Sequence, residues 1–184
     1  KPFWSGHSLG GVMIASAVAA SLLTDDNSRG MVLLGTQTVS RPKYLWAPLV
    51  ATAVRLKASI KGELDGRKLN IGPENEPAGV IKEFVEQNTW FGRWELASQE
   101  LPLMPAWNVV NSIPLLAIAG ADDKSDPAKA CLKFANSYGG SKECLLLGTQ
   151  QGYSRNFGHV DMVVSKAAAK EVWPKIGEWL NKQQ

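Results

Sequence analysis

Near the start of the chain, a serine lies in a glycine-rich run, Gly6-His7-Ser8-Leu9-Gly10, whose composition suits nucleophilic chemistry. An apolar run precedes it and another follows, which is typical of a strand that passes through a tight turn into a helix. Such a turn serves either as a compact crossover or as a support that holds the Ser8 hydroxyl out toward solvent. The turn alone leaves both interpretations open.

A neutral serine hydroxyl needs a base to accept its proton and an acid to orient that base. The sequence contains two histidines. His7 lies inside the turn, where its side chain is expected to point away from that of Ser8, so we expect it to have a structural role. His159 follows the last expected strand and is the candidate base. A helix-capping or surface histidine is the alternative for His159.

Three aspartates compete for the role of the acid in the run from Gly120 to Pro127: Asp122, Asp123 and Asp126. Their alternative role is turn formation and helix capping, and Asp126, just before the proline, fits a cap best. Loops that follow the carboxyl ends of parallel strands gather at one edge of the sheet. We therefore expect Ser8, one of these aspartates and His159 to meet there.

The elements that must position these residues alternate between strand and helix. This alternation predicts an α/β fold, a parallel sheet with helices on both faces. The expected strands cover residues 2–5, 31–35, 113–120 and 144–147, and the expected helices cover 9–23, 127–138 and 163–180. Segment 9–23 is shorter than the roughly 20 residues that span a bilayer and is expected to be a buried helix.

A long insertion interrupts this alternation. Residues 39–105 contain two expected helices, 46–56 and 78–87, around a polar loop at 61–77. We therefore divide the chain into a core, 1–38 with 106–184, and a helical cap or lid, 39–105. Four aromatic side chains in the insertion could line a substrate pocket, or could simply pack the insertion against the core: Trp46, Trp90, Phe91 and Trp94.

Composition narrows the function classes. The formal net charge is +3 and the basic residues are scattered among acidic ones, which disfavours a nucleic-acid or membrane patch. No cluster of metal ligands and no phosphate-binding glycine loop is visible, so we expect no metal and no cofactor. Cys131 and Cys144 could form a disulfide or remain buried thiols, and the cellular compartment stays open.

The run from Gly6 to Gly10 resembles the G-x-S-x-G nucleophile elbow of the α/β-hydrolases, in the expected strand–turn–helix context. The chain order serine, aspartate, histidine also matches that family. The family's G-x-x-D pattern after the penultimate strand selects Asp123 over Asp122. The resemblance covers nearly all of the chain and implies the C-terminal half of such a fold. The strands expected before the elbow are absent, and a separate segment could supply them.

The resemblance implies roles for individual residues. Ser8 would attack an acyl carbonyl, His159 would act as general base and then acid, and Asp123 would orient His159. The backbone N–H of Leu9 would be one oxyanion donor. Gly6 and Gly10 would leave room for the turn, and Gly11 would let the following helix pack closely.

The implied activity is the cleavage of an apolar carboxylic ester through an acyl-enzyme, as in carboxylesterases and lipases. A thioesterase or acyltransferase could use the same three residues. A non-catalytic interaction module that keeps the fold is the alternative from another class.

Overall fold

The computed structural model describes residues 1–38, 47–65, 67, 74–81, 94–96, 101–109 and 111–183. The chain forms two compact units. The first consists of Lys1–Ser40 together with Leu96–Gln184, and the second is Arg41–Glu95. Every residue of the predicted serine, aspartate and histidine set belongs to the first unit.

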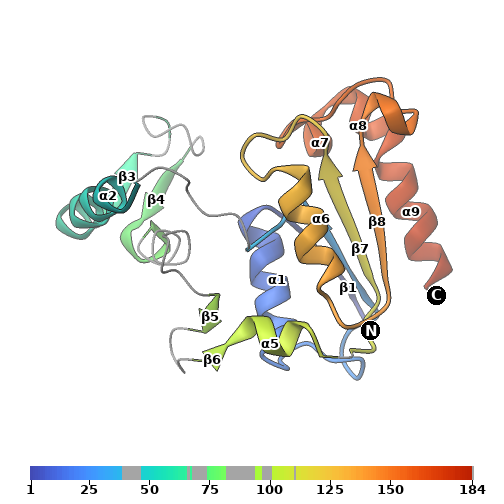
Figure 1. Ribbon diagram of the computed structural model, residues 1–184, viewed down its shortest axis with the longest axis horizontal. Helices are drawn as coiled ribbons and strands as arrows, with labels where there is room; N and C mark the ends of the chain where they lie inside the picture. The colour runs from blue at the N-terminus through green and yellow to red at the C-terminus, as the bar shows by residue number, and fades with distance from the viewer. Residues whose placement is uncertain are drawn as a thin grey trace. The chain divides into compact units, whose positions relative to one another are not determined.

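The described part of the first unit is built on a four-stranded parallel sheet in the order β1-β2-β7-β8 (Figure 1). The strands are β1 (Phe3–His7), β2 (Gly30–Leu34), β7 (Leu115–Gly120) and β8 (Lys142–Leu147). All residues of β2 and β7 are buried, as expected of parallel strands that helices cover on both faces. The predicted α/β class and parallel sheet are confirmed.

Helices cover both faces of this sheet (Figure 1). On one face, α1 (Leu9–Ala19) packs on β1 and β2, α6 (Ala128–Asn136) packs on β7 and β8, and α5 (Leu103–Trp107) packs against α1. On the other face, α7 (Asp161–Val164), α8 (Lys166–Glu171) and α9 (Trp173–Lys182) bury a cluster that includes Leu116, Met162 and Trp179. A short 3-10 turn, η1 (Thr149–Gln151), follows β8.

The prediction of one closing helix over 163–180 is wrong, because three short helices replace it. Ser165 has extended backbone angles, φ −73° and ψ 154°, which end α7. Its hydroxyl accepts a hydrogen bond of 2.9 Å from the Ala168 N–H and so caps α8. A proline, Pro174, lies in the first turn of α9, where a missing N–H costs nothing.

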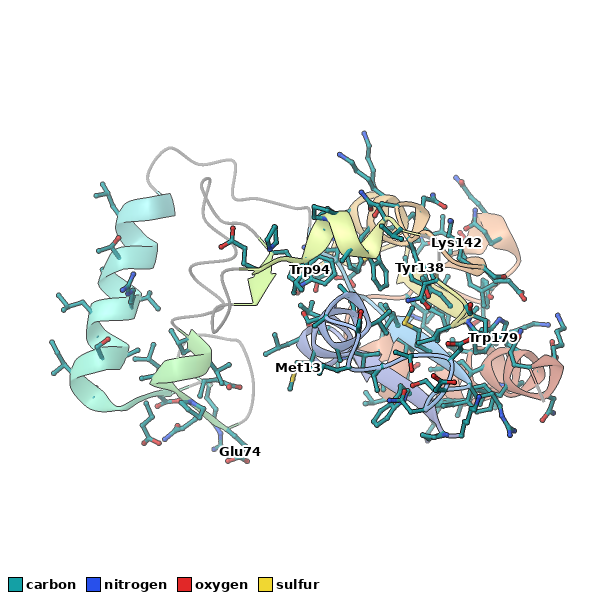
Figure 2. All side chains as sticks on the ribbon, turned by 90° about the horizontal axis from the view of Figure 1, so that it is seen from below. Met13, Glu74, Trp94, Tyr138, Lys142 and Trp179 are labelled. Carbon is teal, nitrogen blue, oxygen red and sulfur yellow. The ribbon has the colours of Figure 1, made fainter. Side chains whose placement is uncertain are left out.

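The first helix is shorter and more exposed than predicted. It ends at Ala19, and Ser21 follows in the left-handed region with φ 58°. Of its residues, only Gly11, Ala15, Val18 and Ala19 are buried. The Met13 side chain is 67% exposed and projects from α1 on the side away from Tyr138 and Trp179 (Figure 2). The helix therefore packs along one face, and no described residue of its unit covers the Leu9 and Met13 side chains fully.

The second unit has a small core of its own, formed by Ala58, Leu64 and Ile81. Its helix α2 (Ala47–Lys61) runs further than the predicted 46–56. At the two ends of the polar loop predicted at 61–77, β3 (Glu63–Asp65) and β4 (Asn75–Pro77) pair in antiparallel fashion, and residues 66 and 68–73 lie outside the described residues. Residues 78–81 are helical, and the rest of the helix predicted at 78–87 lies outside the described residues.

The remaining strands are β5 (Glu95–Leu96) and β6 (Leu101–Pro102), which pair with each other where the chain passes from the second unit to the first. Helix α5 begins inside the predicted insertion of 39–105, yet Leu103 and Trp107 are buried in the first unit. The role of the insertion as a cap stays a prediction. No helix in the described part of the chain is long and apolar enough to cross a membrane.

The two cysteines do not form a disulfide. Cys131 is buried and Cys144 is exposed, and both are free thiols. Of the two alternatives that the sequence left open, the buried thiol is correct for Cys131, and Cys144 fits neither. Burial is the main cause that raises the pKa of the Cys131 thiol, so that thiol is protonated and unreactive at neutral pH.

Candidate active site

Ser8 lies in the turn between β1 and α1 with strained backbone angles, φ 54° and ψ −122°. A non-glycine residue there costs on the order of 1–3 kcal/mol and persists only where the surrounding structure imposes it. The Ser8 N–H donates to the Leu34 carbonyl at 2.9 Å, and its carbonyl accepts from Gly11 at 3.0 Å and Val12 at 3.1 Å. These bonds fix the turn to β2 and α1 at the carboxyl end of β1.

Two of the three glycines around this turn are required by space. A Cβ on Gly6 would lie 2.6 Å from backbone atoms of Gly10 and Gly11, and a Cβ on Gly11 would lie 2.0 Å from the Thr36 hydroxyl oxygen. The predicted reasons for Gly6 and Gly11 therefore agree with the structure. The prediction for Gly10 is wrong, because a Cβ there meets nothing within 4 Å.

A hydrogen bond of 2.8 Å joins His159 Nδ1 to Asp123 Oδ2. The other carboxylate oxygen of Asp123 accepts backbone N–H bonds from Ser125 at 3.0 Å and Asp126 at 2.8 Å. The Asp123 side chain is completely buried, whereas Asp122 is exposed. Of Asp122 and Asp123, Asp123 is the one whose carboxylate lies within hydrogen-bond distance of the histidine, as the resemblance implied.

The Asp123 hydrogen bond is the main cause that raises the pKa of His159, while burial acts in the opposite direction. Because the carboxylate accepts from Nδ1, the neutral imidazole carries its proton on Nδ1 and leaves the Nε2 lone pair available. This tautomer is the one that a general base acting through Nε2 requires.

The loop that carries His159 is tied to both neighbouring strand ends. The N–H of the buried Phe157 donates to the Leu147 carbonyl at 3.1 Å, and the Phe157 carbonyl accepts from Asp122 at 3.0 Å. The Asp161 carboxylate accepts the Gly158 N–H and pairs with Arg155 at 2.9 Å. The acid loop and the histidine loop therefore hold each other in place.

Gly35, directly after β2, packs against the Asp123–His159 pair and was not singled out from the sequence. It has φ 52°, and a Cβ there would lie 3.1 Å from His159 Nδ1 and 3.2 Å from Asp123 Oδ2. A side chain at this position would displace the pair. A glycine immediately after a buried strand is the sequence signal that could have indicated it.

His7 contacts the candidate base, although the sequence suggested only a structural role for it. Its Nε2–H donates to the His159 carbonyl at 2.9 Å, and the two ring centroids are 4.5 Å apart. Burial is the main cause that lowers the pKa of His7, and the neighbouring His159 lowers it further. His7 is therefore neutral at neutral pH.

The prediction that Asp126 caps the following helix is wrong. The N-cap of α6 is Pro127, and no side chain makes a capping hydrogen bond there. Asp126 Oδ1 instead accepts from the Gln37 amide at 2.8 Å, and Oδ2 lies 3.8 Å from His159 Nε2. The position of Asp126 just before a helix does not show that its carboxylate points toward Gln37 and His159.

The structure brings Ser8, Asp123 and His159 to the carboxyl ends of β1, β7 and β8. Among the hydrogen bonds of the described residues, none joins the Ser8 hydroxyl to His159. Leu9 is the first residue of α1, with a side chain that is 41% exposed.

Of the predicted pocket residues, Trp94 has a buried side chain and belongs to the stretch of sequence assigned to the second unit. Trp46, Trp90 and Phe91 lie outside the described residues. No described group of three or more His, Cys, Asp or Glu side chains could hold a metal ion.

No protein-family model matches the chain, and no curated protein matches its sequence. Solved structures do match. The mouse protein "alpha/beta hydrolase domain-containing protein 10" superposes on 99% of this chain with a TM-score of 0.54 at 17% identity. The chain has the α/β-hydrolase fold.

Two further neighbours with the α/β-hydrolase fold are lipolytic enzymes. The monoacylglycerol lipase of Paleococcus ferrophilus matches 100% of this chain with a TM-score of 0.64 at 14% identity. A structure from the work on LipS and LipT, two metagenome-derived lipolytic enzymes, matches 99% with a TM-score of 0.61 at 18% identity. The chain spans 69% of the first, 65% of the second and 62% of the mouse protein. At these identities the likeness establishes the fold.

Proposed function

We propose that this chain carries the nucleophile, base and acid of a serine hydrolase that cleaves carboxylic esters through an acyl-enzyme. One observation carries the proposal: the 2.8 Å hydrogen bond between His159 Nδ1 and the buried carboxylate of Asp123, at the sheet edge where the strained Ser8 turn lies. A serine on a strained strand-to-helix turn and a histidine oriented by a buried acid are features of the nucleophile elbow and its base.

In this mechanism, the Ser8 Oγ attacks the ester carbonyl carbon while His159 Nε2 takes the hydroxyl proton. The backbone N–H of Leu9 donates to the oxyanion that forms, and Asp123 stabilises the imidazolium. The tetrahedral intermediate then releases the alcohol, which takes the proton from Nε2. Water attacks the acyl-enzyme with the same base, and collapse of the second intermediate returns the acid product and free Ser8.

Exposed apolar side chains beside the reacting groups favour an apolar ester. Leu9 directly follows Ser8, Met13 lies one turn further along α1, and Val160, which directly follows His159, is 58% exposed. The two lipolytic neighbours are consistent with this substrate class. Residues 39–105 are proposed to form the cap over the substrate, with Trp46, Trp90, Phe91 and Trp94 as candidate lining residues.

The second oxyanion donor is proposed to come from a segment that this sequence does not include. In the described sheet β1 pairs with β2 alone, so its other edge can accept a further strand. Thioester hydrolysis or acyl transfer would use the same acyl-enzyme. A non-catalytic module would keep the fold while the Ser8 hydroxyl remained unreactive.

Hydrolysis of neutral p-nitrophenyl esters of increasing acyl length tests the proposal. We expect turnover that rises with acyl length, is lost in Ser8→Ala and persists in Ser5→Ala, a matched change at an exposed serine of β1. Equal activity of Ser8→Ala and the unaltered chain would overturn the assignment of Ser8.

A further inference from the structure

His159 faces a carboxylate at each of its two ring nitrogens. Asp123 Oδ2 lies 2.8 Å from Nδ1, and Asp126 Oδ2 lies 3.8 Å from Nε2. The proposed mechanism uses the first carboxylate and leaves the second without a role. The Asp126 side chain is only 18% exposed, so water screens it weakly from the imidazole.

The position of Asp126 is imposed by groups outside its own side chain. Its Oδ1 accepts from Gln37 Nε2 at 2.8 Å, and Gln37 belongs to the segment after β2. Its backbone N–H donates to Asp123 Oδ1 at 2.8 Å, which places both acids in one turn. Asp126 is therefore directed at His159 by two independent contacts.

The proximity of Asp126 to Nε2 is favourable when that nitrogen carries a proton. A neutral imidazole with a lone pair on Nε2 would repel a carboxylate at this distance, whereas an imidazolium N–H would attract it. The same lone pair is the one that must accept the Ser8 proton. Asp126 therefore acts on the nitrogen that performs the proposed chemistry, on the opposite side of the ring from Asp123.

We propose that Asp126 is a second acid for His159, a positioning residue whose carboxylate holds Nε2 in its protonated form and so competes with the Ser8 hydroxyl for that nitrogen. The effect on catalysis rests on the proposed hydrolase function. The coupling between Asp126 and His159 does not depend on it.

The groups that face these two side chains give the direction of the effect. His159 meets Asp123 and Asp126 from the loop after β7 and His7 from β1, and His7 is neutral for the reason given above. Asp126 meets Gln37 and His159, and the Cys131 thiol donates to its backbone carbonyl. The pKa of Asp126 is raised, chiefly by burial and further by the neighbouring Asp123, and the Gln37 hydrogen bond and His159 offset only part of this.

An ionised Asp126 therefore favours the imidazolium, and its removal lowers the pKa of His159. An opposite charge within about 4–6 Å shifts a pKa by about 1–3 units. In a variant that lacks the Asp126 carboxylate, the acid limb of the pH–rate profile of any reaction that needs neutral His159 therefore moves to lower pH. Asp126→Asn should consequently react faster than the unaltered chain below neutral pH.

NMR titration of the imidazole resonances tests the coupling, and a His159→Gln variant assigns the resonances of His159. We expect Asp126→Asn to lower the pKa of His159 by about one unit or more. Asp122→Asn is the matched control, because it removes the same charge from an exposed position in the same loop and should leave that pKa unchanged. An unchanged pKa in folded Asp126→Asn would overturn the proposal.

Asp126→Ser provides a second variant if the amide does not fold, with the same expected direction. The pH profile of fluorophosphonate reaction at Ser8 separates this proposal from the proposed function. If Ser8 reacts but the acid limb of the pH profile is unmoved in both Asp126 variants, the result contradicts the role proposed for Asp126 and leaves the hydrolase proposal intact. Absence of reaction at Ser8 at every pH contradicts the hydrolase function, while the NMR titration still decides the coupling.

Discussion

The ring of His7 donates a hydrogen bond of 2.9 Å to the carbonyl oxygen of His159 and lies against the imidazole of that residue, with ring centroids 4.5 Å apart. His7 immediately precedes Ser8 at the end of β1. The contact therefore links the turn that carries the proposed nucleophile to the loop that carries the proposed base, across 152 positions of sequence.

Replacing His7 should loosen this link. His7→Phe keeps a ring but removes the donor, and we expect a loss of about 1 kcal/mol in the free energy of unfolding, the net value of a typical hydrogen bond. The rate of covalent reaction at Ser8 should fall in parallel. His7→Gln, which can still donate, is the matched variant. Equal unfolding midpoints in urea for the two variants would show that the hydrogen bond contributes nothing.

The two adjacent glycines of α1 should respond oppositely to alanine. Gly11→Ala places a Cβ 2.0 Å from the Thr36 hydroxyl oxygen and should destabilise the chain by about 1–3 kcal/mol, as overpacking does. Gly10→Ala meets nothing within 4 Å and should be neutral or stabilising by up to about 1 kcal/mol, because alanine favours helix. Thermal unfolding of both variants measures the contrast. The same loss in both would contradict the packing described for this turn.

The strain at Ser8 should be released by glycine. At φ 54° and ψ −122°, Ser8→Gly is expected to be more stable than Ser8→Ala by about 1 kcal/mol or more, because glycine adopts this region at little steric cost. Both variants lack the hydroxyl and should lack ester hydrolysis. Chemical denaturation compares their stabilities, and a less stable glycine variant would argue against strain at this residue.

The contribution of His159 to stability should depend on pH. Its folded pKa is raised above the ordinary value of 6.5, chiefly by the hydrogen bond to Asp123. A raised folded pKa contributes stability that is fully present below the unfolded pKa and is lost as pH rises through the folded pKa. His159→Gln should therefore cost more at about pH 5.5 than at about pH 8.5. Urea unfolding at the two pH values tests this, and a larger cost at the higher pH would reverse the sign of the effect.

The sequence predicts the parallel sheet because strands and helices alternate along the chain, and it predicts the turn at Ser8 because small residues flank it. It does not predict contacts that depend on where loops return in space. Gly35, His7 and Asp126 reach His159 from three different loops or strand ends. The position of Gly35 after a buried strand marks it as unusual, but nothing local shows that it packs against His159, and no local pattern distinguishes His7 from a structural histidine or Asp126 from a helix cap.

The errors in the helices have local physical causes that the apolar periodicity hides. The pattern over 163–180 continues through Ser165, whose extended backbone and capping hydroxyl nevertheless interrupt the helix. Leu9 and Met13 are apolar, as expected of the buried helix predicted at 9–23, but they are exposed because α1 has only one face against its sheet. The apolar pattern of a helix shows how many of its residues could be buried, whereas actual burial depends on which elements pack against each face of that helix.

The central claim is that Ser8 is a nucleophile activated by His159. Treatment of the folded chain with a fluorophosphonate, followed by mass spectrometry to locate the adduct, tests it most directly. The account predicts a single adduct on Ser8 that is lost in His159→Ala and retained in Asp122→Asn. A folded chain that acquires no adduct, or one whose adduct on Ser8 persists at an undiminished rate in His159→Ala, would contradict it.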